Sequence, residues 1–160
     1  MDITNDTMLT SVLNTIAENV ITVVSIKVLA LLQKNIMSLV YELGGPNHYY
    51  YNGSGVPTYQ FLHAFKWDEL QNSITKVTKT LFYDWASMEF NPTLFLHGDP
   101  ARGDQRQQLA EALDVEGWDN GILGGKQRGA YFKNTMDDLL GGTLNDWFRE
   151  EFRNYGIIKT

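Results

Sequence analysis

The sequence predicts an α+β fold with a long N-terminal helix, a small antiparallel sheet, C-terminal helices and an extended loop. Three observations lead to this prediction. Residues 9–43 repeat apolar side chains every three or four positions, which is the spacing of one helix face. Residues 74–83, ITKVTKTLFY, are rich in β-branched and aromatic side chains, as strands are. The stretch after Thr143 again repeats apolar side chains at helical spacing.

The chain of 160 residues has no internal repeat, no low-complexity tract and no linker, so we expect a single domain, residues 1–160. Its parts are a long helix at about 7–43, an interaction loop at about 44–60 and an α+β remainder at 61–160. Acidic residues number 19 and basic residues 13, and the net charge of −6 disfavours a clamp for nucleic-acid phosphates. Cysteine is absent, which excludes disulfides and thiolate metal sites.

The predicted long helix carries more apolar surface than one face needs. Between Val20 and Leu32, side chains such as Val23 and Ile26 fall outside the main stripe, so this section is apolar nearly all round. Either the rest of the domain or a second copy of the chain can cover it, and both interpretations stay open. The β-branched run at residues 21–24 lowers helix propensity, and we allow for a break there. The main stripe is Leu9, Leu13, Ile16, Val20, Val24, Val28, Leu32, Ile36, Leu39 and Leu43.

A membrane-spanning segment is not expected. The most apolar stretch, Val20 to Leu32, has 13 residues and contains Lys27, whereas a helix needs roughly 20 apolar residues to cross a bilayer. The first residues, MDITNDTML, are acidic and polar, which predicts no secretory signal.

The loop after the long helix is the strongest candidate for a partner interface. Gly44, Gly45 and Pro46 predict the helix end. The segment that follows combines tyrosines with glycines, which gives large contact area with polar tips, as at protein interfaces. The alternative, that its rings fold back on the domain, stays open. The candidate interface residues are Tyr49, Tyr50, Tyr51, Val56, Pro57 and Tyr59 in the loop, with Val23 and Ile26 on the helix.

The remainder is predicted as short elements. We expect one or two helical turns within 59–70, one strand at Ile74 to Tyr83 and a shorter strand at 93–96. A helix at 104–115, a glycine-rich connection at 117–125 and a helix at Arg128 to Leu140 follow. Thr143 with Asp146 resembles a capping box that begins the terminal helix, and Gly156 ends it. Its apolar stripe, expected in the core, is Leu144, Trp147, Phe148, Phe152 and Tyr155.

The residues that could carry chemistry do not form a recognisable site. His97 and Asp99, with Asp104, could supply a base and a carboxylate, but loop residues fix no geometry and we interpret them as a polar turn. The glycines before Lys126 lack the spacing and the hydroxyl of a phosphate-binding loop. Asp137, Asp138 and the acids of the terminal helix, Asp146, Glu150 and Glu151, are interpreted as solvated faces. We therefore predict no catalytic, cofactor-binding or metal-binding residue, and no enzyme.

Several segments in order resemble a known family. Residues 57–65, PTYQFLHAF, precede ITKVTKTLFYD, then His97-Gly98 and a helix from Arg106 to Leu113. This series resembles the neck or tail-completion proteins that join head to tail in tailed bacteriophages. Proteins of that family have a long N-terminal helix, a mobile loop with an Arg-Thr-x-x-Phe-Leu type motif, a small sheet and C-terminal helices. Pro57 stands where the family usually has arginine.

The resemblance implies a structural virion protein that is assembled in the host cytoplasm and forms an oligomeric ring at the phage neck. Its partners would be further copies of itself and the adjoining head-completion or adaptor proteins and tail terminator or tube proteins. DNA would pass through the ring without specific binding, and an acidic wall suits that passage. The alternatives are a small soluble adaptor or regulatory binding module and, less favoured, a small hydrolase or nuclease.

Overall fold

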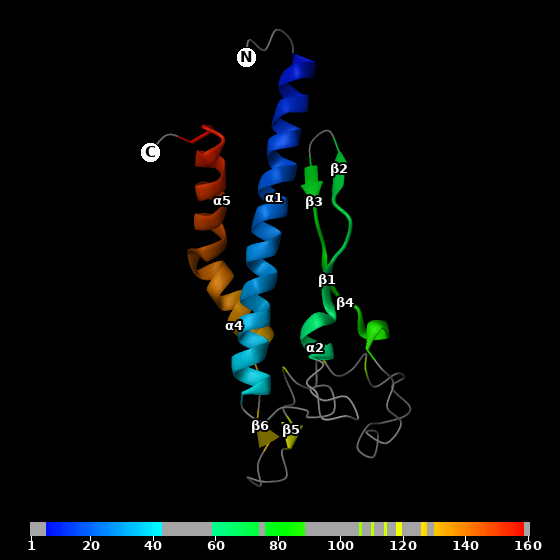
Figure 1. Ribbon diagram of the computed structural model, residues 1–160. Coiled ribbons are helices and arrows are strands. Elements are labelled where there is room, and N and C mark those ends of the chain that lie inside the picture. Colours follow the sequence, from blue (N-terminus) through cyan, green and yellow to red (C-terminus); the bar gives the residue numbers. More distant parts are fainter. Residues whose placement is uncertain are drawn as a thin grey trace. The chain divides into compact units, whose positions relative to one another are not determined.

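The computed structural model describes residues 6–42, 59–73, 76–88, 106, 110, 114, 118–119, 126–127 and 130–158. It has a long N-terminal helix, a small antiparallel sheet and C-terminal helices, so the predicted α+β fold is confirmed (Figure 1). The predicted strand at 93–96 lies outside the described residues, and of the predicted helix at 104–115 only residues 106, 110 and 114 are described.

The chain divides into two compact units. Unit 1 comprises Met1–Ala30, Trp67–Leu81 and Asp137–Thr160, and unit 2 comprises Leu31–Lys66 and Phe82–Met136. That the whole chain forms one domain stays a prediction.

Helix α1 (Asp6–Ile36) has 31 residues and continues as the π-helical turn η1 (Met37–Tyr41). It runs unbroken through residues 21–24, so the break that the sequence allowed there does not occur. The β-branched side chains of Val20 and Val24 are buried there, with exposed fractions of 0% and 3%, and this burial offsets the cost of restricting their rotamers. The predicted helix stop at Gly44 lies outside the described residues.

By length and composition alone, the helix from Asp6 to Tyr41 could cross a membrane. The sequence argument considered a stretch of 13 residues only, and it therefore underestimated the length of this apolar helix. A core helix of a soluble protein has the same length and composition. Within unit 1, Glu18 and Ser25 accept hydrogen bonds from Asn72 and Trp67, and Lys27 donates to two glutamates. Such side-chain contacts are those of a helix packed against protein.

The strands form short pairs. In chain order, β1 (Phe65–Trp67) pairs with β4 (Leu81–Tyr83), and β2 (Gln71–Ser73) pairs antiparallel with β3 (Lys76–Thr78) in the register Asn72↔Val77. The prediction of one strand over 74–83 is wrong, because β3 and β4 are separate strands within that range. The helical turn predicted before them is confirmed as α2 (Gln60–His63), and the 3-10 turn η3 (Trp85–Ser87) follows β4. Strand β5 (Trp118–Asp119), inside the predicted glycine-rich connection, pairs antiparallel with β6 (Lys126–Gln127), which directly follows that connection.

The C-terminal helices follow one another directly. Helix α4 (Tyr131–Asp138) continues into the π-helical turn η7 (Leu139–Thr143), and α5 (Leu144–Asn154) begins at once. Gly142 has φ 125° and interrupts the helix as predicted, and Gly156, with φ 70°, ends α5. The predicted capping box is wrong. Thr143 has helical backbone angles and no side-chain cap hydrogen bond, because the π-helical turn leads directly into α5.

The core of unit 2 contains a cluster of four aromatic rings. The Phe61 ring, which is fully buried, lies 5.4 Å from Phe65, 5.8 Å from Tyr83 and 5.6 Å from Tyr131, measured between centroids. The three contacts are edge-to-face, the favoured geometry for rings. The Tyr131 hydroxyl donates a 2.8 Å hydrogen bond to the Ala110 carbonyl. Burial raises the pKa of the Tyr131 hydroxyl, so this group stays a neutral donor.

Candidate protein-protein interface

Most of the predicted loop interface cannot be placed. Residues 49–51, 56 and 57 lie outside the described residues, and their interface role stays a prediction. Tyr59 is described and half-buried, and its backbone is left-handed with φ 50°. Its ring packs edge-to-face on Tyr41, with 5.5 Å between centroids. In this structure Tyr59 therefore contacts its own chain.

The helix residues of the predicted interface are described in full, and they lie in unit 1. Ile26 is exposed over 64% of its surface, the largest exposure of any large apolar side chain of α1. Val23, one turn away, is half-buried. Helical spacing places Ile26 in a row of exposed residues that we term the outer face of α1. The outer face consists of Thr15, Asn19, Thr22, Ile26 and Ala30.

Two other faces of α1 are covered within unit 1. On one side the indole Nε1 of Trp67 donates a 2.9 Å hydrogen bond to the Ser25 carbonyl, and Asn72 of β2 donates to the Glu18 carboxylate. On another side lies α5 (Figure 1). The sequence left open whether the apolar middle of this helix is covered by its own chain. Unit 1 covers part of it and leaves Ile26 uncovered.

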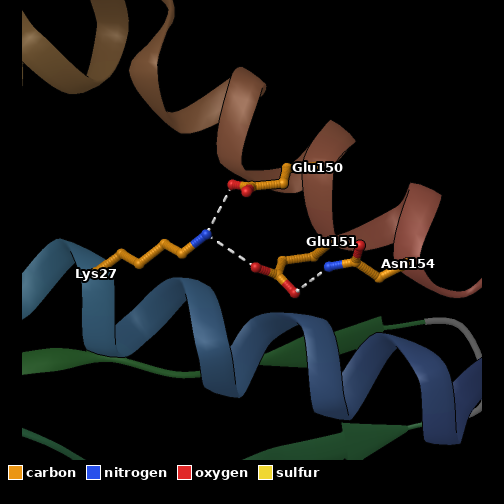
Figure 2. Close-up of polar contacts among 4 residues, drawn as sticks. All are labelled: Lys27, Glu150, Glu151 and Asn154. Atoms are coloured by element: carbon orange, nitrogen blue, oxygen red, sulfur yellow. Dashed lines mark hydrogen bonds and ion pairs between the residues drawn. The ribbon is translucent and has the colours of Figure 1, made fainter. Parts of the chain in front are cut away.

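Figure 2 shows how α5 is attached to α1. The Lys27 ammonium lies 2.9 Å from Oε2 of Glu150 and 2.8 Å from Oε1 of Glu151. Asn154 donates to the second oxygen of Glu151 at 3.3 Å. The Glu151 side chain is only 12% exposed, against 60% for Glu150. Sequence reasoning treated both acids as solvated, which is wrong for Glu151.

The ion pair between Lys27 and Glu151 shifts the pKa of both groups. Hydrogen bonds to Glu151 and then to Glu150 raise the pKa of the Lys27 ammonium above its ordinary value. The hydrogen bond from Lys27 lowers the pKa of the Glu151 carboxyl below its ordinary value. Both shifts favour the charged forms, so Lys27 and Glu151 are both ionised at neutral pH.

The apolar stripe of α5 lies on the same side of the helix as Glu151. Trp147 precedes Glu151 by one turn, and Phe148 and Phe152 stack with 6.3 Å between their centroids. These three side chains are half-buried, and no residue of α5 is fully buried. Sequence reasoning expected them in the core, and the structure corrects this, because each of the three side chains keeps part of its surface exposed. We use the term α1–α5 seam for Lys27 with its partners Glu150 and Glu151, together with the rings of Trp147, Phe148 and Phe152 on the same side of α5.

Sequence reasoning missed the pairing across this seam. The signal was present as Lys27, a single charge inside the most apolar section of a helix, and as adjacent glutamates in an amphipathic helix.

Among the described residues, no group of three or more histidine, cysteine, aspartate or glutamate side chains could hold a metal ion. The residues His97, Asp99 and Asp104 lie outside the described part of the chain.

Comparison with known proteins gives no match to any family model, curated protein or solved structure.

Proposed function

We propose that this chain is a structural virion protein, a ring-forming subunit of a bacteriophage neck that joins the DNA-filled head to the tail. The observation that carries the proposal is the outer face of α1. The helix has an apolar middle, and Ile26 at its centre remains 64% exposed after unit 1 has covered other faces. Contact with another subunit would remove this large apolar side chain from water.

A ring needs a contact that joins two different surfaces of neighbouring copies. The outer face of α1 would form one side of that contact. The resemblance of the sequence to neck proteins supports the neck as the place of the ring, and the net charge of −6 suits a channel that DNA passes without binding.

Sedimentation velocity over a range of concentrations, with negative-stain images, tests the proposal. We expect concentration-dependent association and ring-shaped particles. Ile26→Glu should weaken association, because it places a charge in the contact. Gln71→Glu is the matched control, since it adds the same charge at an exposed position of β2. A compact monomer at every concentration, together with the lack of a ring in isolated phage particles, would refute the proposal.

A membrane protein is the second candidate function, because α1 with η1 is long and apolar enough to span a bilayer. The outer face argues for protein contact instead, since it also carries Thr15, Asn19 and Thr22. Flotation of the purified chain with lipid vesicles separates the two candidates. Co-flotation that persists at high salt supports the membrane role, and recovery in the lipid-free fraction supports the soluble subunit.

A further inference from the structure

Helix α5 has a strong amphipathic pattern, but its own chain holds it only weakly. Its aromatic stripe is half-buried, and none of its side chains is fully buried. The described polar contacts that join it to α1 all pass through Lys27. Releasing α5 therefore exposes little fully buried surface and breaks one ion-pair cluster.

The segment before α5 has a backbone that can bend. Gly141 and Gly142 lie in the π-helical turn η7, and open space surrounds the position where a side chain of either would stand. Gly142 has φ 125°, a backbone conformation that side-chain-bearing residues rarely adopt. Two adjacent glycines give this joint more conformational freedom than a pair of any other residues would give at the same position.

The surface that fits α5 is present on every copy of the chain. Lys27 on α1 is complementary in charge to Glu150 and Glu151 on α5, and the aromatic stripe occupies the same side of α5 as Glu151. An isolated helix of 11 residues is marginally stable in water, so a released α5 needs a docking surface. The α1 of a neighbouring copy offers the same contacts as the α1 of its own chain.

We propose that α5 is an exchangeable arm, which docks on α1 of a neighbouring copy when the chain associates and reproduces the α1–α5 seam between subunits. The proposal rests on the proposed self-association and adds a second contact between copies to the one at the outer face of α1. Exchange of an identical element needs no new surface, because the contacts within the monomer become contacts between subunits. A high local concentration of copies favours the exchanged form.

Complementary charge reversal tests the exchange. One variant carries Lys27→Glu and the other carries Glu150→Lys with Glu151→Lys. Within each variant the seam brings like charges together, whereas exchange between the two variants restores opposite charges at both seams. The two are mixed in equal amounts in urea, refolded together and analysed by native mass spectrometry. We expect mixed oligomers to outnumber oligomers of either variant alone by at least tenfold.

A matched control uses charges on the opposite side of α5. Asp146 and Arg149 are exposed and lie away from Glu151 on the helix. A mixture of Asp146→Lys and Arg149→Glu should form mixed and uniform oligomers in statistical proportions. Statistical proportions in the seam mixture as well would overturn the exchange.

Crosslinking gives an independent measurement, since the chain contains no cysteine. A chain with Lys27→Cys and Glu151→Cys is treated with a short bismaleimide and run on a denaturing gel. Exchange predicts crosslinked dimers and larger species whose yield rises with concentration. Crosslinks only within single chains, in a protein that still forms rings, overturn the exchange and leave the ring. Crosslinks between chains in a protein that forms no ring support the exchange and refute the ring. Crosslinks only within single chains of a protein that stays monomeric refute both.

Discussion

The ring cluster of unit 2 and the α1–α5 seam of unit 1 are both aromatic, yet they hold their elements in different ways. In the cluster, Phe61 is fully buried and contacts three other rings. In the seam, Phe148 and Phe152 contact each other and remain half-buried. An aromatic pattern in a sequence therefore does not tell whether a helix is fixed or releasable. The burial of the aromatic rings shows whether the helix is fixed or releasable.

The largest effect that separates the two regions is expected from truncating one ring in each. Phe61→Ala should destabilise the protein by about 3–5 kcal/mol, because it leaves a cavity among three rings. Trp147→Ala should cost about 1–2 kcal/mol, since part of that side chain is already in contact with water. Urea denaturation of both variants of the full chain measures the difference. Equal costs would mean that the seam is as tightly packed as the cluster.

A smaller effect is expected at the joint before α5. Gly142→Ala should cost about 1–3 kcal/mol, because φ 125° strains a residue with a side chain. Gly141→Ala is the matched control, since no positive φ is required there and nothing lies within 4 Å of the added methyl group. We expect it to be neutral or slightly stabilising. Thermal denaturation compares the two. A loss of stability at Gly141 equal to that at Gly142 would contradict a backbone cause.

The smallest effect is expected from the ion pairs of the seam. Lys27→Met should lower stability by roughly 1 kcal/mol or less at neutral pH, as partly exposed ion pairs contribute little. Lys76→Met, at an exposed position of β3, is the control and should change stability even less.

The pH dependence of this difference follows from the two pKa shifts. The pKa of Glu151 is lowered in the folded protein, so its contribution is complete above its ordinary value of 4.5 and is lost as pH falls through the lowered value. The pKa of Lys27 is raised, so its contribution is complete below 10.5 and is lost as pH rises through the raised value. Thermal midpoints of wild type and Lys27→Met should therefore converge in acid. A constant difference from pH 7 to pH 2 would show that the ion pairs are not its cause.

The long helices were predictable from the sequence, and the short strands were not. Helix α1 repeats its apolar spacing over many turns, and the repeat identified α5 from a few large side chains. The strands have two or three residues each, and β2, with the sequence QNS, has no apolar alternation to detect. Their existence depends on pairing with neighbouring strands, which no local pattern contains.

The candidate interface was predictable in part. The spacing of apolar residues placed Val23 and Ile26 off the main stripe, and the structure leaves Ile26 exposed. The pairing of Lys27 with Glu150 and Glu151 was missed, because these residues are separated by 123 and 124 positions in the chain. Charge complementarity over such distances is established only by the fold. For the same reason the half-burial of Trp147 could not be read from its helical spacing.

The start of α4 has a consequence for the order in which unit 2 folds. The Asp114 carboxylate accepts a 2.7 Å hydrogen bond from the backbone N–H of Phe132, 18 residues later. Asp114 also accepts a bond from the N–H of Ala130 on its carbonyl, and Ala130 has the strained φ of 46°. The first turn is the costly step of helix formation, and here its cap comes from a distant segment. We therefore expect α4 to form late, after chain collapse has closed that loop, and not to act as a folding nucleus.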